Sequence, residues 1–111
     1  MASISPEIES ILRKFIALLQ KDKRISKIFL YGSHAKGLAT EWSDIDLAVV
    51  SPDFSDDLFE ERVRLMRLGL LVDERIEPSP FRPEDFNDND PLVNEINKSG
   101  IEIVGVLDNV R

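Results

Sequence analysis

Apolar residues recur at helical spacing in the first part of the chain. Isoleucine, leucine and phenylalanine return every three or four positions, at Ile8, Ile11, Leu12, Phe15, Leu18 and Leu19. This periodicity is typical of a helix with one buried stripe. Ser5-Pro6 is a typical helix start, with serine as the N-cap and proline in the first turn. We therefore predict a helix that begins near Pro6 and ends at the charged run 21–24.

Short apolar runs further along the chain predict strands. The runs 28–31, 45–50 and 101–104 are rich in β-branched and aromatic residues. A fourth strand, 75–78, should end at or near Pro78, because proline excludes a long central strand. The order of elements predicts an α/β (α+β) fold, with helices packed against a small mixed sheet. The length fits a single domain over residues 1–111.

Helices are predicted between these strands. A short helix follows Ser33, another covers about 55–71, a turn of helix lies at 82–86, and a last helix at 91–98 stops at Gly100. For the helix 55–71 we expect a packing face made of Leu58, Val63 (or Arg62 with its stem packed), Leu65, Met66 and Leu70.

Composition narrows the class of protein. The 14 Lys and Arg against 21 Asp and Glu give a net charge of −7, which argues against broad binding to nucleic acid. The absence of cysteine excludes disulfides and cysteine zinc sites. There is neither an apolar run of membrane-spanning length nor the pattern of a secretory signal, so we expect a soluble, cytoplasmic protein without a membrane partner.

Two aspartates stand at the start of the strand 45–50. Asp44 and Asp46 are two positions apart, and alternate residues of a strand share a face, so both carboxylates should project from one side. Close carboxylates repel each other unless a cation lies between them, and Mg²⁺ prefers oxygen ligands. By itself the pair is weak evidence: Asp44 could equally cap the loop while Asp46 faces solvent.

Gly32 and Ser33 follow the strand 28–31 directly and open a helix. Glycine lets a phosphate approach the backbone closely, and a helix N-terminus offers free N–H donors to an anion. Ser33 could add a hydroxyl donor, and Lys36 a positive charge. An ordinary turn and a solvated lysine are the alternatives when each residue is judged singly. Together with the aspartates, these residues favour a site for a nucleoside triphosphate and magnesium.

The two motifs resemble those of a known family. Gly32-Ser33-His34-Ala35-Lys36-Gly37, followed by Ser43-Asp44-Ile45-Asp46-Leu47, is similar to the signature of the minimal nucleotidyltransferases in the DNA polymerase beta-type superfamily. The resemblance implies a magnesium-dependent enzyme that transfers a nucleoside monophosphate, with ATP as the expected donor. It implies that Gly32, Ser33 and Lys36 bind the nucleotide and that the aspartates are catalytic metal ligands.

The family also implies a third carboxylate on a neighbouring strand. Glu77 and Asp73 are the two candidates, and we favour Glu77 because apolar residues flank it in a strand-like run. The family more often has aspartate at this position, and arginine where this chain has Lys36. These departures keep open an alternative, a non-catalytic module that binds a nucleotide or a partner with the same fold.

By the same resemblance, the acceptor is expected on a partner protein. Small domains of this family are often antitoxins that pair with a HEPN-domain toxin, and some attach AMP to it. Two neighbouring residues carry separate expectations: His34 should face solvent, and Trp42 should pack over its loop.

Overall fold

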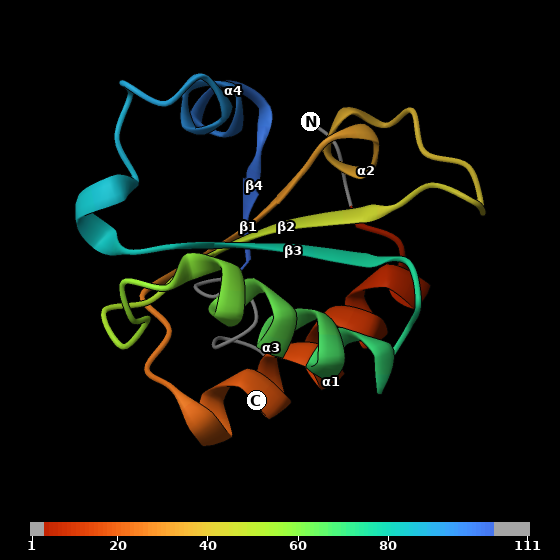
Figure 1. The fold of residues 1–111 in the computed structure, drawn as a ribbon. Helices are drawn as coiled ribbons and strands as arrows, with labels where there is room; N and C mark the ends of the chain where they lie inside the picture. The colour runs from red at the N-terminus through yellow and green to blue at the C-terminus, as the bar shows by residue number, and fades with distance from the viewer. Residues whose placement is uncertain (1–3, 104–111) are drawn as a thin grey trace.

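The computed structural model describes residues 4–103 of the chain (Figure 1). Its elements are, in order, α1 (Pro6–Asp22), β1 (Lys27–Tyr31), α2 (Ser33–Lys36), β2 (Ile45–Val50), α3 (Leu58–Leu70), β3 (Ile76–Phe81), the 3-10 turn η1 (Pro83–Asp85), α4 (Pro91–Ser99) and β4 (Ile101–Glu102). Among these residues, no helix is both long and apolar enough to cross a membrane. Val104, the last residue of the expected strand 101–104, lies outside the described residues.

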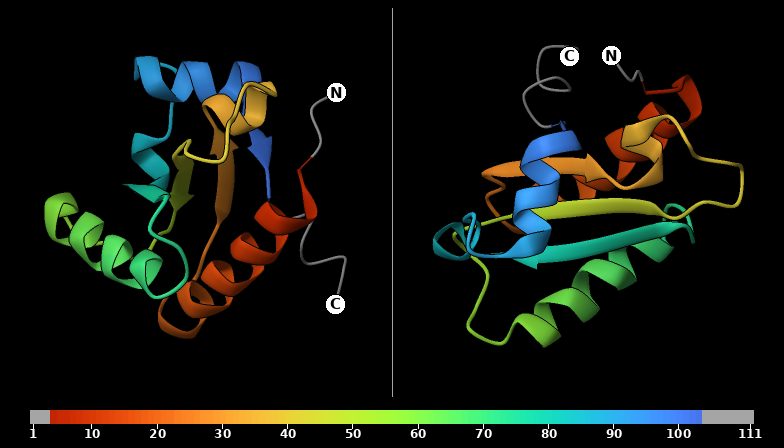
Figure 2. Two further views of the ribbon diagram at one scale, coloured as in Figure 1. Left: turned by 90° about the vertical axis from the view of Figure 1, so that its right-hand side faces the viewer. Right: turned by 90° about the horizontal axis from the view of Figure 1, so that it is seen from above.

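The four strands form one mixed sheet in the order β3-β2-β1-β4. β1 runs antiparallel to both β2 and β4, whereas β2 and β3 are parallel. α1 and α3 cover one face of the sheet, and α4 and α2 lie on the other side (Figures 1 and 2). The expected α/β fold with a mixed sheet is therefore confirmed.

Alternation along β2 divides the interior into two cores. Ile45, Leu47 and Val49 pack with α1 and α3 in the larger core, whereas Ala48 and Val50 join the smaller core beneath α4. Asp46 alternates with the first set, so its side chain lies on the face of the smaller core. Asp46 is only partly buried on that face, whereas Ala48 and Val50 are buried.

The first helix begins as predicted. The hydroxyl oxygen of Ser5 accepts a hydrogen bond of 3.2 Å from the backbone N–H of Ile8, which satisfies a free donor of the first turn. The helix predicted at 55–71 begins later, at Leu58, because the side chain of Asp57 caps it by accepting a bond of 3.0 Å from the N–H of Glu60.

Two predictions about local structure were wrong. The strand around Pro78 does not end there but runs through Pro80 to Phe81, because β3 lies at the edge of the sheet, where proline is tolerated. Met66 and Leu70 do not pack inward: they are 43% and 67% exposed. α3 faces the core through Glu61, Leu65 and Gly69 instead, with Leu58 and Leu68 partly buried beside them.

Candidate active site

The turn between β1 and α2 places Gly32 against Asp46. Gly32 has φ 73° and ψ −150°, a conformation that residues with a Cβ rarely adopt. Its carbonyl oxygen accepts hydrogen bonds from the N–H groups of Ala35 (3.1 Å) and Lys36 (3.2 Å), which close the single turn of α2. A Cβ added to Gly32 would collide with Oδ2 of Asp46. Glycine therefore lets this backbone lie directly against the carboxylate.

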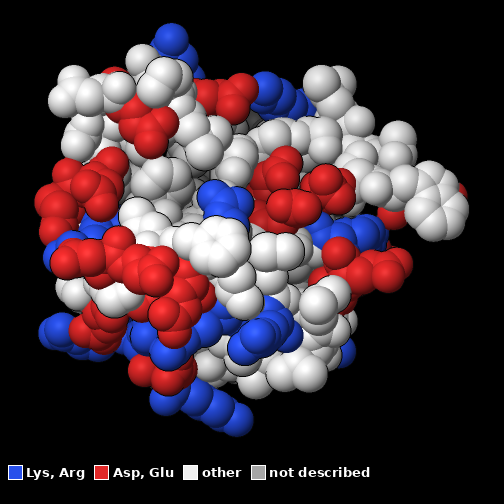
Figure 3. All heavy atoms as spheres, viewed as in Figure 1, with Lys and Arg blue, Asp and Glu red and all other residues white. Residues whose placement is uncertain are grey.

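The pairing of the strands surrounds Asp46 with polar side chains. In the sheet register Asp46 lies opposite Tyr31 of β1 on one side and Glu77 of β3 on the other, so the three side chains share a face. Asp44 immediately precedes β2. In Figure 3, acidic side chains gather on this open face of the sheet, below α2.

The electrostatics of this face act on Asp46. Burial raises the pKa of its carboxyl group most, and the negative charges of Asp44 and Glu77 raise it further. His34 lowers this pKa, and Glu95 of α4 raises it. Within residues 4–103, Asp44, Asp46 and Glu77 take part in no ion pair or side-chain hydrogen bond; we infer that this group of carboxylates favours a cation.

The carboxylates of this face fit magnesium if a bound nucleotide supplies part of the ligands. Within residues 4–103, no three His, Asp or Glu side chains are close enough to form a ready metal site. Mg²⁺, however, often binds proteins through one or two carboxylates and takes its other oxygens from substrate phosphates and water. Asp44 and Asp46 meet that requirement, since neither pairs with a cation within residues 4–103; burial, and then the like charges of Asp44 and Glu77, raise the pKa of Asp46.

The two candidates for the third carboxylate differ in their surroundings. Asp73 is held by Arg75, with Oδ1 accepting from Nε and Oδ2 from Nη2, both at 3.0 Å. These bonds keep the pKa of Asp73 below its usual value. Glu77 is exposed and lies directly across the β2–β3 pair from Asp46. The arrangement thus leaves Glu77, and not Asp73, available to the site.

The two other expected nucleotide-binding residues lie on α2. Ser33 is half-buried at the start of this turn, directly after Gly32. Lys36 is exposed, and its Nζ lies 3.3 Å from Oε1 of Glu95, on α4. Lys36 would have to leave Glu95 to reach a phosphate, and an exposed ion pair of this kind is worth only about 0–1 kcal/mol.

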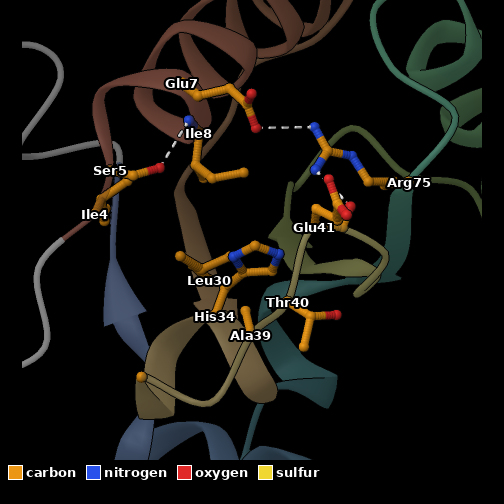
Figure 4. A pocket seen from close by; sticks show the side chains of 11 residues that line it. Ile4, Ser5, Glu7, Ile8, Leu30, His34, Ala39, Thr40, Glu41 and Arg75 are labelled. Carbon is orange, nitrogen blue, oxygen red and sulfur yellow. Dashed lines mark hydrogen bonds and ion pairs between the residues drawn. The ribbon is translucent and has the colours of Figure 1, made fainter.

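His34 does not face solvent as expected. It is half-buried, and its Nε2 is inaccessible and has no hydrogen-bond partner within residues 4–103. The imidazole points into a hollow of about 310 Å³ between the start of α1 and the loop 37–41 (Figure 4). His34 and Lys36 leave the single turn of α2 in different directions. His34 points toward the start of α1, whereas Lys36 points toward α4. None of Asp44, Asp46 and Glu77 lines this hollow.

The prediction for Trp42 was also wrong: its side chain is 82% exposed and does not pack over the loop.

The sequence analysis missed two residues near the carboxylates, Tyr31 and Glu95. The hydroxyl of Tyr31 lies 3.5 Å from the hydroxyl of Ser79, and burial raises the pKa of Tyr31. Glu95 is on a separate helix, 49 positions after Asp46, where no sequence motif connects the two. The sequence could have indicated Tyr31, because this residue directly precedes Gly32 of the first motif.

Comparison with known families agrees with this geometry. The family described as "Nucleotidyltransferase domain" matches residues 11–102, which is most of the chain. The chain belongs to the nucleotidyltransferase family. The match contains Gly32, Asp44, Asp46 and Glu77, and it makes this protein a nucleotidyltransferase by descent.

Two relatives of this nucleotidyltransferase come from Methanocaldococcus jannaschii. "Putative protein adenylyltransferase MJ1379" is 39% identical over 72 residues, which are 60% of this chain and 72% of the relative. "Putative protein adenylyltransferase MJ0128" is 37% identical over 76 residues, or 66% of this chain and 76% of the relative.

Solved structures share the fold of this nucleotidyltransferase. A mutant of the toxin–antitoxin MntA-HpeT has a TM-score of 0.61 and 26% identity, covering 83% of this chain and 70% of that one. A toxin–antitoxin crystallised with AMP-PNP has a TM-score of 0.60 and 22% identity, covering 85% and 70% of the two chains. At that lower identity, the second likeness concerns the fold alone.

Proposed function

We propose that this nucleotidyltransferase transfers AMP from Mg-ATP to a hydroxyl group on a partner protein. One observation carries the proposal: the carboxylates of Asp44, Asp46 and Glu77 have no ion-pair partner within residues 4–103, and Asp46, which lies across from Glu77, is in contact with the glycine turn at Gly32. The relatives named protein adenylyltransferases support AMP as the transferred group and a protein as the acceptor.

Each residue has a distinct role in this proposal. Asp44 and Asp46 hold the magnesium that comes with the triphosphate, and Glu77 completes the acidic wall on the β3 side. Gly32 and Ser33 present the backbone and a hydroxyl to the outgoing phosphates, and Lys36 moves from Glu95 to join them. Held by Asp44 and Asp46, magnesium would neutralise charge on the phosphates and would make the acceptor hydroxyl more acidic.

The transfer is a substitution at phosphorus. The acceptor oxygen forms a bond to the α-phosphorus as the bond from this phosphorus to the oxygen bridging it to the β-phosphorus breaks. Pyrophosphate leaves, the hydroxyl proton passes to solvent, and the acceptor retains AMP. The protein contributes position and electrostatics, which account for most of the catalysis in reactions of this type.

We further propose that the partner is a HEPN-domain toxin, for which this protein is the antitoxin. The toxin–antitoxin structures that share the fold support a partner protein. We expect the enzyme in the cytoplasm, where both ATP and such a partner are present.

A labelling experiment tests the proposal. The purified protein is incubated with Mg²⁺, ATP labelled at the α-phosphate and a purified HEPN-domain protein as candidate acceptor. We expect label on the partner, and no label with the double variant Asp44→Asn/Asp46→Asn. Asp85→Asn serves as the matched control, because Asp85 is an exposed carboxylate of η1 outside the site. Equal labelling by wild type and the double variant would refute catalysis by these aspartates.

Calorimetry separates catalysis from the non-catalytic alternative. Titration of Mg-ATP into wild type should release heat that the double variant does not release. Binding without transfer to any partner would favour a nucleotide-binding module, and the absence of binding would leave a partner-binding module.

A further inference from the structure

The outer side of α3 carries an apolar stripe that no described residue covers. Phe59, Met66 and Leu70 are 77%, 43% and 67% exposed, and Val63 is partly exposed between them. Figure 2 shows α3 at the margin of the molecule, with one side free. Contiguous exposed apolar side chains on a small protein mark an interaction surface.

The spacing of the stripe is that of a helix-pairing seam. Phe59, Val63, Met66 and Leu70 are separated by four, three and four residues, which is the alternation of d and a positions in a heptad. At 3.6 residues per turn, this row lies on the side of α3 away from Leu65 and Gly69, which face the core. The stripe therefore points away from the sheet and is accessible to a binding partner.

We propose that the stripe binds a second copy of this chain, with the two α3 helices antiparallel about a two-fold axis. In this arrangement Phe59 meets Leu70 of the other copy, and Val63 meets its Met66. Each contact occurs twice, as in any isologous interface. A hollow of about 450 Å³ lies beside the stripe; Phe59 and Val63 form its apolar part, and its other lining residues are charged, namely Asp57, Glu60, Arg64 and Arg67.

Charge selects this partner and this orientation. Glu60 and Arg67 lie on the same flank of the stripe, seven residues apart, and Oε1 of Glu60 also lies 3.3 Å from Nη2 of Arg64 on its own helix. In the antiparallel pair, like flanks face each other, so each Glu60 lies near Arg67 of the other copy. In a parallel pair, Arg62 would instead face Arg67 of the other copy, five positions further along, and like charges would repel.

The pairing leaves both active sites open. The stripe points away from the sheet on the α1–α3 side, whereas Asp46 lies on the opposite face. The contact rests mainly on one helix of 13 residues, so it belongs to the small, weak class of interfaces. We therefore expect a dimer that dissociates at concentrations of about 1–50 μM.

Sedimentation velocity on the purified full chain tests the dimer. Between about 1 μM and 1 mM, wild type should shift from monomer to dimer. Met66→Glu should remain monomeric throughout, with unchanged circular dichroism. Leu38→Glu is the matched control, because Leu38 is also an exposed apolar residue (72%) but lies on the loop after α2; it should dimerise like wild type. A wild-type monomer at every concentration, or a dimer that survives Met66→Glu, would overturn the proposal.

A charge reversal tests the ion pairs. Glu60→Arg and Arg67→Glu should each weaken the dimer by about tenfold, and the two changes combined should restore it. Failure of the combined variant to recover, with normal circular dichroism, would overturn the assigned pairing.

Engineered thiols test the orientation, and the chain has no native cysteine to interfere. Phe59→Cys and Leu70→Cys chains, mixed under oxidising conditions, should form the mixed disulfide. Neither should link to itself, since equivalent positions in an antiparallel pair lie roughly 16 Å apart along the helix axis. Self-linked Phe59→Cys dimers would refute the antiparallel arrangement.

Discussion

Replacing Gly32 by alanine introduces one methyl group at the point where the backbone meets Asp46. Two effects follow. The backbone at φ 73° and ψ −150° is in a region that is essentially restricted to glycine. The new Cβ would also collide with Oδ2 of Asp46, so the carboxylate must move out of its place.

Gly37 provides the matched substitution. It has a nearly identical φ of 74° but a ψ of 19°, in the left-handed region, and a Cβ there meets nothing within 4 Å. Alanine at Gly37 should cost about 1 kcal/mol of unfolding free energy. Alanine at Gly32 should cost about 3 kcal/mol, because its region is less accessible and the collision adds to the strain. At about 5 °C per kcal/mol, Tm should fall by about 15 °C for Gly32→Ala and about 5 °C for Gly37→Ala.

Urea unfolding followed by circular dichroism measures these costs, and calorimetry measures the affinity for Mg-ATP. Gly32→Ala should weaken Mg-ATP binding at least about tenfold, since a displaced ligand is costly to a site of fixed geometry. Gly37→Ala should bind as wild type does. If the two variants lose equal stability and both keep wild-type affinity, the contact between the Gly32 backbone and Asp46 does not matter to the site.

Three further outcomes are expected. The raised pKa of Asp46 means that its ionised form opposes folding and that stability falls as pH rises above about 4. Asp46→Asn should therefore raise Tm at pH 7 while it abolishes Mg-ATP binding, and a lower Tm would contradict this. Arg24 lowers the pKa of Asp53 to about 2, so Asp53→Asn should be less stable than wild type in urea at neutral pH. This difference in stability should disappear as the pH falls from about 4 to 2. A difference that stays constant with pH would exclude the ion pair as its cause. Glu95→Gln should release Lys36 and tighten ATP binding about threefold by calorimetry, an effect that Lys36→Ala should cancel.

Local patterns predicted the parts of the site that are close in sequence. Gly32 and the two aspartates lie at the ends of adjacent strands, and alternation along a strand suffices to put Asp44 and Asp46 on one face. Glu77 could be favoured over Asp73 because strand-like residues flank it, and the parallel β2–β3 register places it across from Asp46.

The remaining features depend on tertiary structure. The position of Glu95 beside Lys36 follows from how α4 crosses the sheet, which no local periodicity encodes. The packing face of α3 was misjudged because apolar residues occur on two sides of this helix. Sequence spacing could not tell which side meets the sheet, and the buried Gly69, which packs against Ile76, offers no hydrophobic signal.

The two prolines of β3 have a consequence for assembly. The carbonyl groups of Arg75 and Phe81 bond toward β2, so the residues of opposite parity, Pro78 and Pro80 among them, direct their backbone toward the free edge. Proline has no N–H, so this edge lacks two of the donors that an incoming strand would need. The sheet is thereby protected against edge-to-edge growth and aggregation on the side next to Glu77. A strand from another molecule could therefore not form a continuous ladder on this edge, and the carboxylates of β2 and β3 stay uncovered on this side.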